Sequence, residues 1–378
     1  MRFLFKTVLI TVLFTIAIGC APEKARENAG DTSAIVPEEP LSIIFMIGDG
    51  MGLSQVSSAF YFKDTVSNFE RFSIIGLSKT SSTSHRITDS AAGATAFSTG
   101  EKTYKKAIGV SKDTIALPTI LEELKTEGYN TGLISLTSIT HATPAAFYAH
   151  VENRDMHEAI AMDMMKENVD FFAGAGLKYF TKREDGRNLY AELQAKDYHM
   201  DSTSIATVDP SRRNGFLLAS EGLPSKVQGR GDFLPEVTGI ALEYFENANK
   251  PFFLMVEGSY IDWGGHAKDP EMMVQEVLDF DKTLGIALDY VEKHPNTLLV
   301  VTADHETGGA AIGKFYDTDP KTGKPVENPQ KVAVYFITDQ HTGTHVPVFA
   351  RGKGKELFSG IYENNEIYHK MRQALDME

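Results

Sequence analysis

Residues 41–52 read LSIIFMIGDGMG, and this stretch decides the fold. Residues 41–47 contain no charge, and glycines end the run on both sides of Asp49. A short apolar run that glycines end is typical of a strand buried on both faces of a parallel sheet. We therefore expect a strand that delivers a carboxylate to its carboxyl end, where open α/β sheets bind ligands.

Four further runs predict strands of the same kind. They are residues 130–137 (NTGLISLT), 251–256 (PFFLMV), 297–302 (TLLVVT) and 346–350 (VPVFA). Residues 117–127 and 269–292 separate some of these runs and place apolar residues at helical spacing. Strand and helix alternate along the chain, so the predicted class is α/β.

Composition bounds the function of this chain of 378 residues. Its hydrophobic fraction of 42% and charged fraction of 23% are globular and exclude collagen, coiled coil and wholesale disorder. The formal net charge of −14 argues against nucleic acid as a dedicated partner, because phosphate backbones require basic surface. A single cysteine excludes an intrachain disulfide framework and a Cys-rich zinc module.

The first residues predict export. Residues 1–19 form a signal peptide, with basic Arg2 and Lys6 before an apolar stretch too short to span a bilayer. Cys20 follows Gly19 as in a bacterial lipoprotein signal, and we expect a lipid there; ordinary cleavage leaving a free thiol is the alternative. Residues 20–40 then form a flexible tether with five acids and no aromatic residue. The expected location is periplasmic or cell-surface, with residues 41–378 as one catalytic domain.

Carboxylates and imidazoles gather behind the predicted strands, with glycines beside most of them. Asp262 and His266 stand four apart, Asp304 and His305 are adjacent, and His341 precedes the last strand. A lone histidine is more often a surface or core residue than a ligand. Several histidines together with carboxylates are a donor set that suits Zn²⁺.

Residues 88–96 read TDSAAGATA and predict the start of a helix at an Asp-Ser pair. One interpretation makes the pair an N-cap and nothing more. The other presents the hydroxyl of Ser90 at the positive end of a helix, where a phosphoryl group would also be held. The residues alone leave both open.

Seven segments, in order along the chain, resemble the motifs of the alkaline phosphatases. They are IGDGMG, TDSAAGATAFSTG, KTYKKAIGV, THATPAAFYAHVENR, VEGSYIDWGGH, TADHETGG and HTGTHVPVFARG. The resemblance covers nearly all of the part expected to fold. It implies a three-layer α/β sandwich, in which a central, mostly parallel sheet carries helices on both faces. It also implies a homodimer that hydrolyses small phosphate monoesters and releases inorganic phosphate.

The resemblance assigns roles to matching residues. Ser90 matches the nucleophile that forms a phosphoserine intermediate. Arg154 matches the arginine that grips two phosphate oxygens, and Asp89 matches the aspartate that orients it. His141 and Trp263 match two positions near the bound phosphate that vary within the family.

The implied cofactors are two Zn²⁺ ions and one Mg²⁺ ion. The implied ligands are Asp262, His266 and His341 for the first zinc, Asp49, Asp304 and His305 for the second, and Asp49, Thr143 and Glu257 for magnesium. Five carboxylates at the site (these four Asp and Glu ligands plus Asp89) sum to −5, three divalent ions give +6 and Arg154 gives +1. The occupied site is thus about +2, which lets an acidic protein bind a phosphate dianion; without metal it is −4.

Two other functions compete with this reading. One is a related member of the same superfamily, such as a phosphodiesterase, phosphomutase or sulfatase; Ser90 with Arg154 favours monoesters. The other is a catalytically silent lipoprotein that binds phosphate or zinc. Residues 177–235 match the family poorly and are expected to form an accessory segment covering the sheet, while residues 313–330 are polar and predict a loop.

Overall fold

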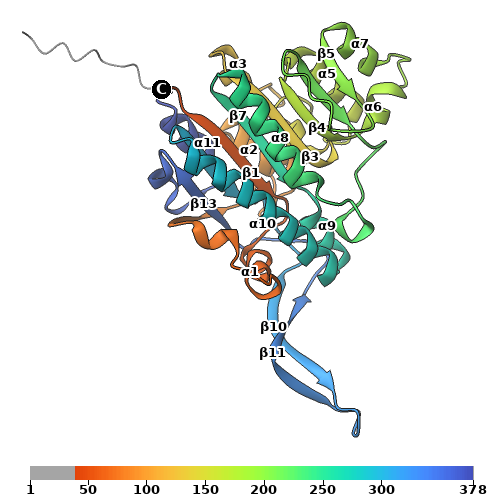
Figure 1. Ribbon diagram of the computed structural model, residues 1–378, viewed down its shortest axis with the longest axis vertical. Helices are drawn as coiled ribbons and strands as arrows, with labels where there is room; N and C mark the ends of the chain where they lie inside the picture. The colour runs from red at the N-terminus through yellow and green to blue at the C-terminus, as the bar shows by residue number, and fades with distance from the viewer. Residues whose placement is uncertain (1–38, 378) are drawn as a thin grey trace, which may run out of the picture. The chain divides into compact units, whose positions relative to one another are not determined.

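The computed structural model describes residues 39–377, and a ten-stranded sheet runs through it (Figure 1). The strands of this sheet are β1 (Ser42–Gly48), β2 (Ile74–Lys79), β3 (Asn130–Ser138), β4 (Phe171–Ala175), β5 (Tyr198–Asp201), β6 (Arg213–Leu217), β7 (Phe252–Gly258), β8 (Thr297–Thr302), β13 (Val346–Gly352) and β14 (Gly360–Glu363). Their order is β14-β2-β13-β8-β1-β7-β3-β4-β6-β5. Only β13 runs antiparallel to its neighbours β8 and β2, so the sheet is mostly parallel, as expected.

Apolar residues cover both faces of this sheet. Successive side chains of β1 alternate between two hydrophobic clusters: Ile43 and Phe45 pack in one, and Ile44 and Met46 in the other. One face carries α1 (Leu53–Phe62), α8 (Phe233–Ala248), α9 (Tyr260–Ala267) and α10 (Pro270–Lys293). The opposite face carries α2 (Ser90–Thr99), α3 (Ile120–Thr126), α4 (Ala142–Ala145), α5 (His157–Glu167), α6 (Leu177–Thr181), α7 (Leu189–Ala195) and α11 (Glu366–Ala374). The expected three layers are therefore confirmed.

Both predicted helices form, with boundaries that their caps explain. α3 begins at Ile120 because Thr119 and Glu122 make a capping box in which each side chain accepts from the other's backbone N–H. α10 begins at Pro270, directly after Asp269, whose carboxylate accepts from the N–H of Met272 at 3.1 Å.

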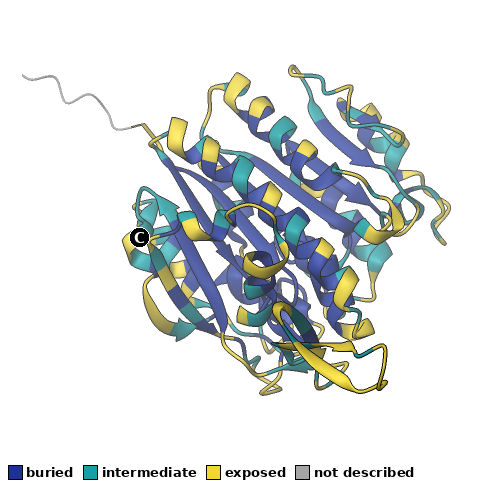
Figure 2. Ribbon diagram, turned by 60° about the horizontal axis from the view of Figure 1, so that its bottom comes forward, coloured by how far each residue is buried: buried dark blue, intermediate teal, exposed yellow. Residues whose placement is uncertain are grey.

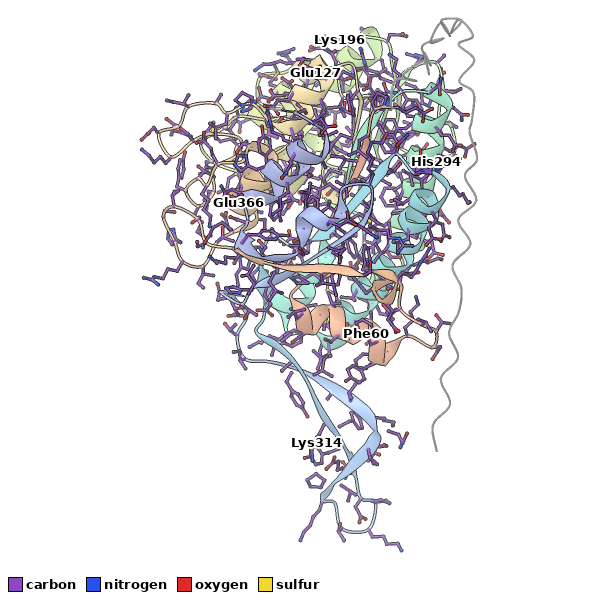
Figure 3. The ribbon with its side chains drawn as sticks, turned by 90° about the vertical axis from the view of Figure 1, so that its left-hand side faces the viewer. Phe60, Glu127, Lys196, His294, Lys314 and Glu366 are labelled. Atoms are coloured by element: carbon purple, nitrogen blue, oxygen red, sulfur yellow. The ribbon has the colours of Figure 1, made fainter. Side chains whose placement is uncertain are left out.

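The prediction of a loop for residues 313–330 was wrong. β10 (Ala310–Thr318) and β11 (Pro325–Phe336) pair there as an antiparallel hairpin, which projects from the sheet (Figure 1). Most of its residues are exposed (Figure 2), so neither strand shows the apolar alternation from which strands are predicted. Lys314 lies out on the hairpin, and Phe60 of α1 lies near its base (Figure 3). Only the tip matches the prediction: Asp319 accepts from the N–H groups of Lys321 and Thr322 in a tight turn.

Residues 177–235 also differ from expectation. Part of the segment does not cover the sheet but extends it, since β6 pairs in parallel with β4, and β5 pairs in parallel with β6. These strands are four and five residues long, which is too short for a clear apolar run in the sequence. Short 3₁₀ helices lie at Asn68–Arg71, Lys226–Gln228 and Lys355–Phe358. Outside the large sheet, β9 (Glu306–Thr307) pairs with β12 (His341–Thr342) in an antiparallel ladder.

The signal peptide predicted for residues 1–19 and the lipid predicted on Cys20 lie outside the described residues, as does all but the end of the predicted tether. From Glu39 onward the chain forms one compact unit. Among residues 39–377, no helix combines the length and apolar character needed to cross a bilayer.

A close approach of α9 to α10 yields a prediction about stability. A Cβ on Gly264 would lie 2.7 Å from the backbone N and Cα of Met273, whereas one on Gly239 in α8 would meet nothing closer than 3.9 Å. We expect Gly264→Ala to lower the free energy of unfolding by about 1–3 kcal/mol through overpacking. The matched Gly239→Ala should raise it by up to about 1 kcal/mol through helix propensity.

Urea midpoints of the two variants, measured in the same metal-containing buffer, check this. Equal shifts in the two variants would contradict the close approach of the helices.

Candidate active site

Four adjacent strands, β8, β1, β7 and β3, carry polar groups to one edge of the sheet. Ile47 pairs with Glu257 on one side and Thr302 on the other, so Asp49 and Asp304 project at the same level just beyond. Gly50 makes this approach possible: its φ is +72°, and a Cβ there would lie 2.8 Å from the Cα of Asp262. The predicted gathering of ligands at the carboxyl ends of the strands is present.

The first group of ligand-type side chains is Asp262, His266 and His341. Nδ1 of His266 lies 2.6 Å from the carbonyl oxygen of Asp339, and Nδ1 of His341 lies 3.0 Å from that of Thr88. A carbonyl only accepts, so each Nδ1 carries the proton and each Nε2 presents a lone pair. The two Nε2 atoms nevertheless face each other at 3.1 Å, and Asp262 oxygens lie 3.4 and 3.5 Å away. The two imidazole lone pairs thus face each other with no donor between them, an arrangement that fits a cation.

The second group is Asp49, Asp304 and His305, all buried. The hydroxyl of Thr307 donates to Asp262, so it can only accept from Nδ1 of His305 at 3.2 Å. Nε2 of His305 is then a lone pair, yet it lies 3.2 Å from Asp304 Oδ2 and 3.6 Å from Asp49 Oδ1. Both of these carboxylate oxygens are buried without a hydrogen-bond partner. Buried polar atoms are normally paired, so these two oxygens also fit a cation.

Glu257 and Thr143 form a third position beside the second group. Ser135 and Ser259 donate to Oε2 of Glu257 at 2.6 and 2.7 Å and fix the carboxylate. Oε1 of Glu257 and Oγ1 of Thr143 have no hydrogen-bond partner although both are buried. Oxygen donors of this kind suit Mg²⁺.

Burial and mutual repulsion shift the pKa values of these groups. Burial, followed by the charges of Asp304 and Asp262, raises the pKa of Asp49 well above its usual value. Burial, with Asp262 second, raises the pKa of Asp304 to about 7. Burial also lowers the pKa of His305 well below its usual value, with His341 adding to the effect. The metal-free protein thus prefers neutral forms here, and a divalent ion reverses that preference.

Ser90 is the first residue of α2, and Asp89 is its N-cap, accepting from the N–H of Ala92 at 3.2 Å. The Ser90 hydroxyl is buried and lies 3.3 Å from Nε2 of His305. Asp89 therefore caps the helix, and Ser90 lies at its positive end beside the second ligand group, so the pair is more than an N-cap.

Two side chains, Asp89 and His141, orient the guanidinium of Arg154. Its Nη1 donates to Asp89 at 3.4 Å, and its Nη2 lies 3.2 Å from Nε2 of His141. Because arginine only donates, His141 must accept through Nε2, and burial and the Arg154 charge together lower the pKa of His141 well below its usual value. Asp89 is held in turn by the backbone N–H of Lys106 at 3.1 Å. The structure therefore brings Ser90, Asp89, Arg154 and His141 together.

Trp263 lies in α9 next to Asp262 but is 45% exposed, and its ring packs on Tyr260 with centroids 4.7 Å apart. Within residues 39–377 it makes no hydrogen bond or ring contact with Arg154 or His141. Trp263 is therefore a partly exposed neighbour of Asp262, and its place near the bound phosphate stays a prediction.

Several residues that support the ligands carry no role in the sequence interpretation. Thr307 bridges the two metal groups, and Ser135 with Ser259 orients Glu257. Glu306 accepts from Gln55, Thr342 and the N–H groups of Gly309 and Ala310. Glu306 and Thr307 follow two ligand-type residues in the TADHETGG segment, and this adjacency could have predicted their supporting role. No feature of the sequence around Ser135 or Ser259 predicts theirs.

Comparisons with known proteins agree with this geometry. The alkaline phosphatase family model matches residues 41–335 and 317–377. Alkaline phosphatase 3 of Bacillus subtilis is 31% identical over 447 aligned positions, which cover 97% of this chain and 96% of that protein. The solved alkaline phosphatase of the Antarctic bacterium TAB5 has 45% identity and a TM-score of 0.85, covering 90% of this chain and 99% of that one. A mutant of the TAB5 enzyme, with Mg bound in its M3 site, gives a TM-score of 0.86. The chain belongs to the alkaline phosphatase family and is a metal-dependent phosphomonoesterase.

Proposed function

We propose that this chain hydrolyses phosphate monoesters through a phosphoserine intermediate on Ser90, with two Zn²⁺ ions and one Mg²⁺ ion. One observation carries the proposal. Lone pairs of three histidines converge with aspartate oxygens beside the Ser90 hydroxyl, and two of these oxygens, Oδ1 of Asp49 and Oδ2 of Asp304, are buried without a hydrogen-bond partner. Such a site requires cations, and the nucleophile stands where the cations would act.

The donor chemistry assigns the ions. Imidazole together with carboxylate suits Zn²⁺. This supports Asp262, His266 and His341 as ligands of the first zinc, and Asp49, Asp304 and His305 as ligands of the second. The all-oxygen set of Asp49, Thr143 and Glu257 suits Mg²⁺. When bound, two such ions supply charge stabilisation for the entering and leaving oxygens of a phosphoryl transfer.

The chain's own residues bind and orient the substrate. Ser90 supplies the attacking oxygen, and the start of α2 directs N–H groups and positive dipole toward the phosphoryl group. Arg154 offers a planar fork for two phosphate oxygens, and Asp89 and His141 hold that fork in one orientation. Phosphoryl transfer to Ser90 breaks the ester bond and releases the alcohol. Water then hydrolyses the phosphoserine to inorganic phosphate and restores the Ser90 hydroxyl.

The partners and location also remain our proposals. Export and lipid attachment at Cys20 rest on the sequence of the first twenty residues. A homodimer has additional support from the surface near the hairpin. A hollow of about 400 Å³ at the hairpin's base is lined by apolar side chains such as Phe62, Val274 and Phe315. Large apolar residues are also exposed on the hairpin and beside it: Tyr316, Val326, Tyr335 and Ile337. A two-fold arrangement would bury both features of each copy.

Metal removal tests the proposed chemistry. Purified protein should hydrolyse p-nitrophenyl phosphate, lose the activity on chelation and regain it with Zn²⁺, most fully with Mg²⁺ added. Ser90→Ala should lose at least about 10³-fold in kcat because the nucleophile is gone. Thr344→Ala, an exposed change outside the ligand groups, is the control.

Two results would overturn the proposal. Metal-loaded protein that hydrolyses phosphate diesters or sulfate esters but not monoesters would indicate another superfamily activity. Phosphate or zinc binding without turnover of any of these esters would indicate a silent binding protein.

The metal-free site yields a pH prediction. Asp304 has a folded-state pKa of about 7 against a usual value of 3.8, so the folded chain holds this proton more tightly than the unfolded chain. The contribution of Asp304 to the stability of the metal-free protein should therefore fall as pH rises from about 4 to about 7, while buried histidines with lowered pKa values, such as His305, contribute with the opposite sign. Urea midpoints at pH 5 and pH 8 measure this slope, which Asp304→Asn should reduce. An unchanged slope in that variant would exclude Asp304 as its source.

If the hairpin surface forms the interface of the proposed dimer, a charge placed on it should dissociate the dimer. Ile337→Asp places a carboxylate on the 84% exposed hairpin residue and should shift the mass in light scattering toward the monomer. Ile361→Asp, on β14 and 62% exposed, is the matched control and should leave the mass unchanged. A wild-type monomer, or dissociation by both variants, would refute the hairpin surface as the interface.

A further inference from the structure

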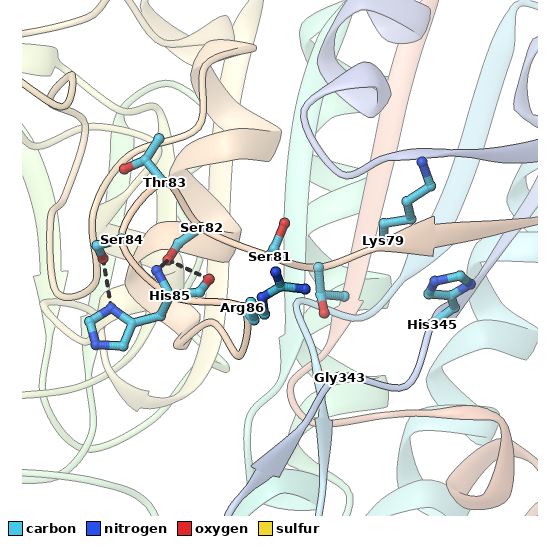
Figure 4. A pocket seen from close by; sticks show the side chains of 10 residues that line it. Lys79, Ser81, Ser82, Thr83, Ser84, His85, Arg86, Gly343 and His345 are labelled. Carbon is cyan, nitrogen blue, oxygen red and sulfur yellow. Dashed lines mark hydrogen bonds between the residues drawn. The ribbon is translucent and has the colours of Figure 1, made fainter.

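A polar pocket shares no residue with the active site, and Figure 4 shows the side chains that line it. Its volume is about 470 Å³, and we call it the loop pocket. Its walls are residues 79–86, which lead from β2 toward α2, together with Gly343 and His345. Both walls continue directly into the site, one to Ser90 and the other back to His341, and His341 Nδ1 donates to the carbonyl of Thr88 at 3.0 Å.

The long wall is held in place by hydrogen bonds. The N–H of Ser82 donates to the carbonyl of His85 at 3.0 Å, and the N–H of Thr83 donates to that of Thr103 at 2.9 Å. The N–H of Lys105 donates to the Ser84 hydroxyl at 3.0 Å. These bonds fasten the loop to residues 102–105, so a ligand entering the pocket would not have to order it.

The pocket is cationic in an acidic protein. Residues 79–112 carry six Lys and Arg against two acids, a net +4, while the whole chain is −14. No carboxylate lines the pocket; its charged and titratable residues are Lys79, His85, Arg86 and His345. Lys79 pairs with Glu363 at 2.9 Å. Arg86 and His345 have no hydrogen bond or ion pair within residues 39–377, so their charge and donors are available to a ligand.

The separation between Arg86 and Ser90 limits the size of a ligand that could contact both. Arg86 lies four residues before Ser90, and four residues of chain span at most about 14 Å. The backbones of Arg86 and Ser90 are therefore close enough for one elongated small molecule to contact both side chains. An arginine presented with hydroxyls suits a phosphate or carboxylate group.

We propose that the loop pocket binds a second anionic group of the substrate and thereby favours phosphate monoesters that carry another phosphate. This proposal rests on the phosphomonoesterase function proposed above. Arg86 would be a specificity-determining residue, since it contacts the part of the substrate that does not react, and His345 would assist it.

Two matched substrates test the inference: 1-butyl phosphate and 1,4-butanediol bisphosphate, assayed by phosphate release from the metal-loaded protein. We expect Arg86→Ala to raise KM for the bisphosphate about five- to tenfold with kcat kept, and to change KM for butyl phosphate less than twofold. Arg86→Lys should retain part of the preference through its charge. Lys112→Ala, which removes an exposed charge outside the pocket, should change neither substrate.

The outcomes separate the two proposals. If wild-type protein hydrolyses neither compound, the proposed function fails. If it hydrolyses both but Arg86→Ala changes their KM values equally or not at all, the loop pocket is not a substrate site. An equal effect of Lys112→Ala on the bisphosphate would show general electrostatic attraction and would also overturn the inference.

Discussion

Electrostatic repulsion among buried carboxylates is the constraint on which the rest of this structure depends. Parallel register sets Asp49 and Asp304 at one level, with Glu257 a step behind, and removes all three from water. Charged groups placed in this way destabilise a fold unless they are protonated or compensated. Divalent cations bound here would compensate these charges and also serve the chemistry, so stability and activity would depend on the same ions.

The protein fixes the orientation of the three imidazoles through a hydrogen bond at Nδ1 of each ring, which leaves Nε2 available to a metal ion. His266 and His341 each donate Nδ1–H to a backbone carbonyl, and His305 donates to the hydroxyl of Thr307. Every Nε2 is thereby left as a lone pair facing the carboxylates, with ring orientation and tautomer set together. Thr307 contacts both metal groups, since its hydroxyl also donates to Asp262. The positions of the two ligand groups are therefore coupled through Thr307.

The sequence was sufficient for the parts of the fold that bury apolar runs. The five central strands and the two amphipathic helices could be predicted because each repeats one physical pattern, and the ligand-type residues stood out through their place behind those strands. The hairpin at residues 310–336 could not, because pairing between exposed strands leaves no hydrophobic signature. The strands β5 and β6 could not, because they are only four and five residues long. The supporting roles of Ser135, Ser259 and Thr307 depend on contacts across the fold, which no local pattern encodes.

The short ladder between β9 and β12 has a consequence for how such proteins can diverge. Thr307 pairs with His341 and Glu306 with Thr342, so the chain is clamped at both ends of the projecting hairpin. The spacing between the ligands His305 and His341 is set by this clamp and not by the number of residues between them. Insertions or deletions beyond the clamp change loop entropy only slowly with length. Evolution or an engineer can therefore replace the hairpin by a longer or shorter module while the catalytic geometry is inherited unchanged.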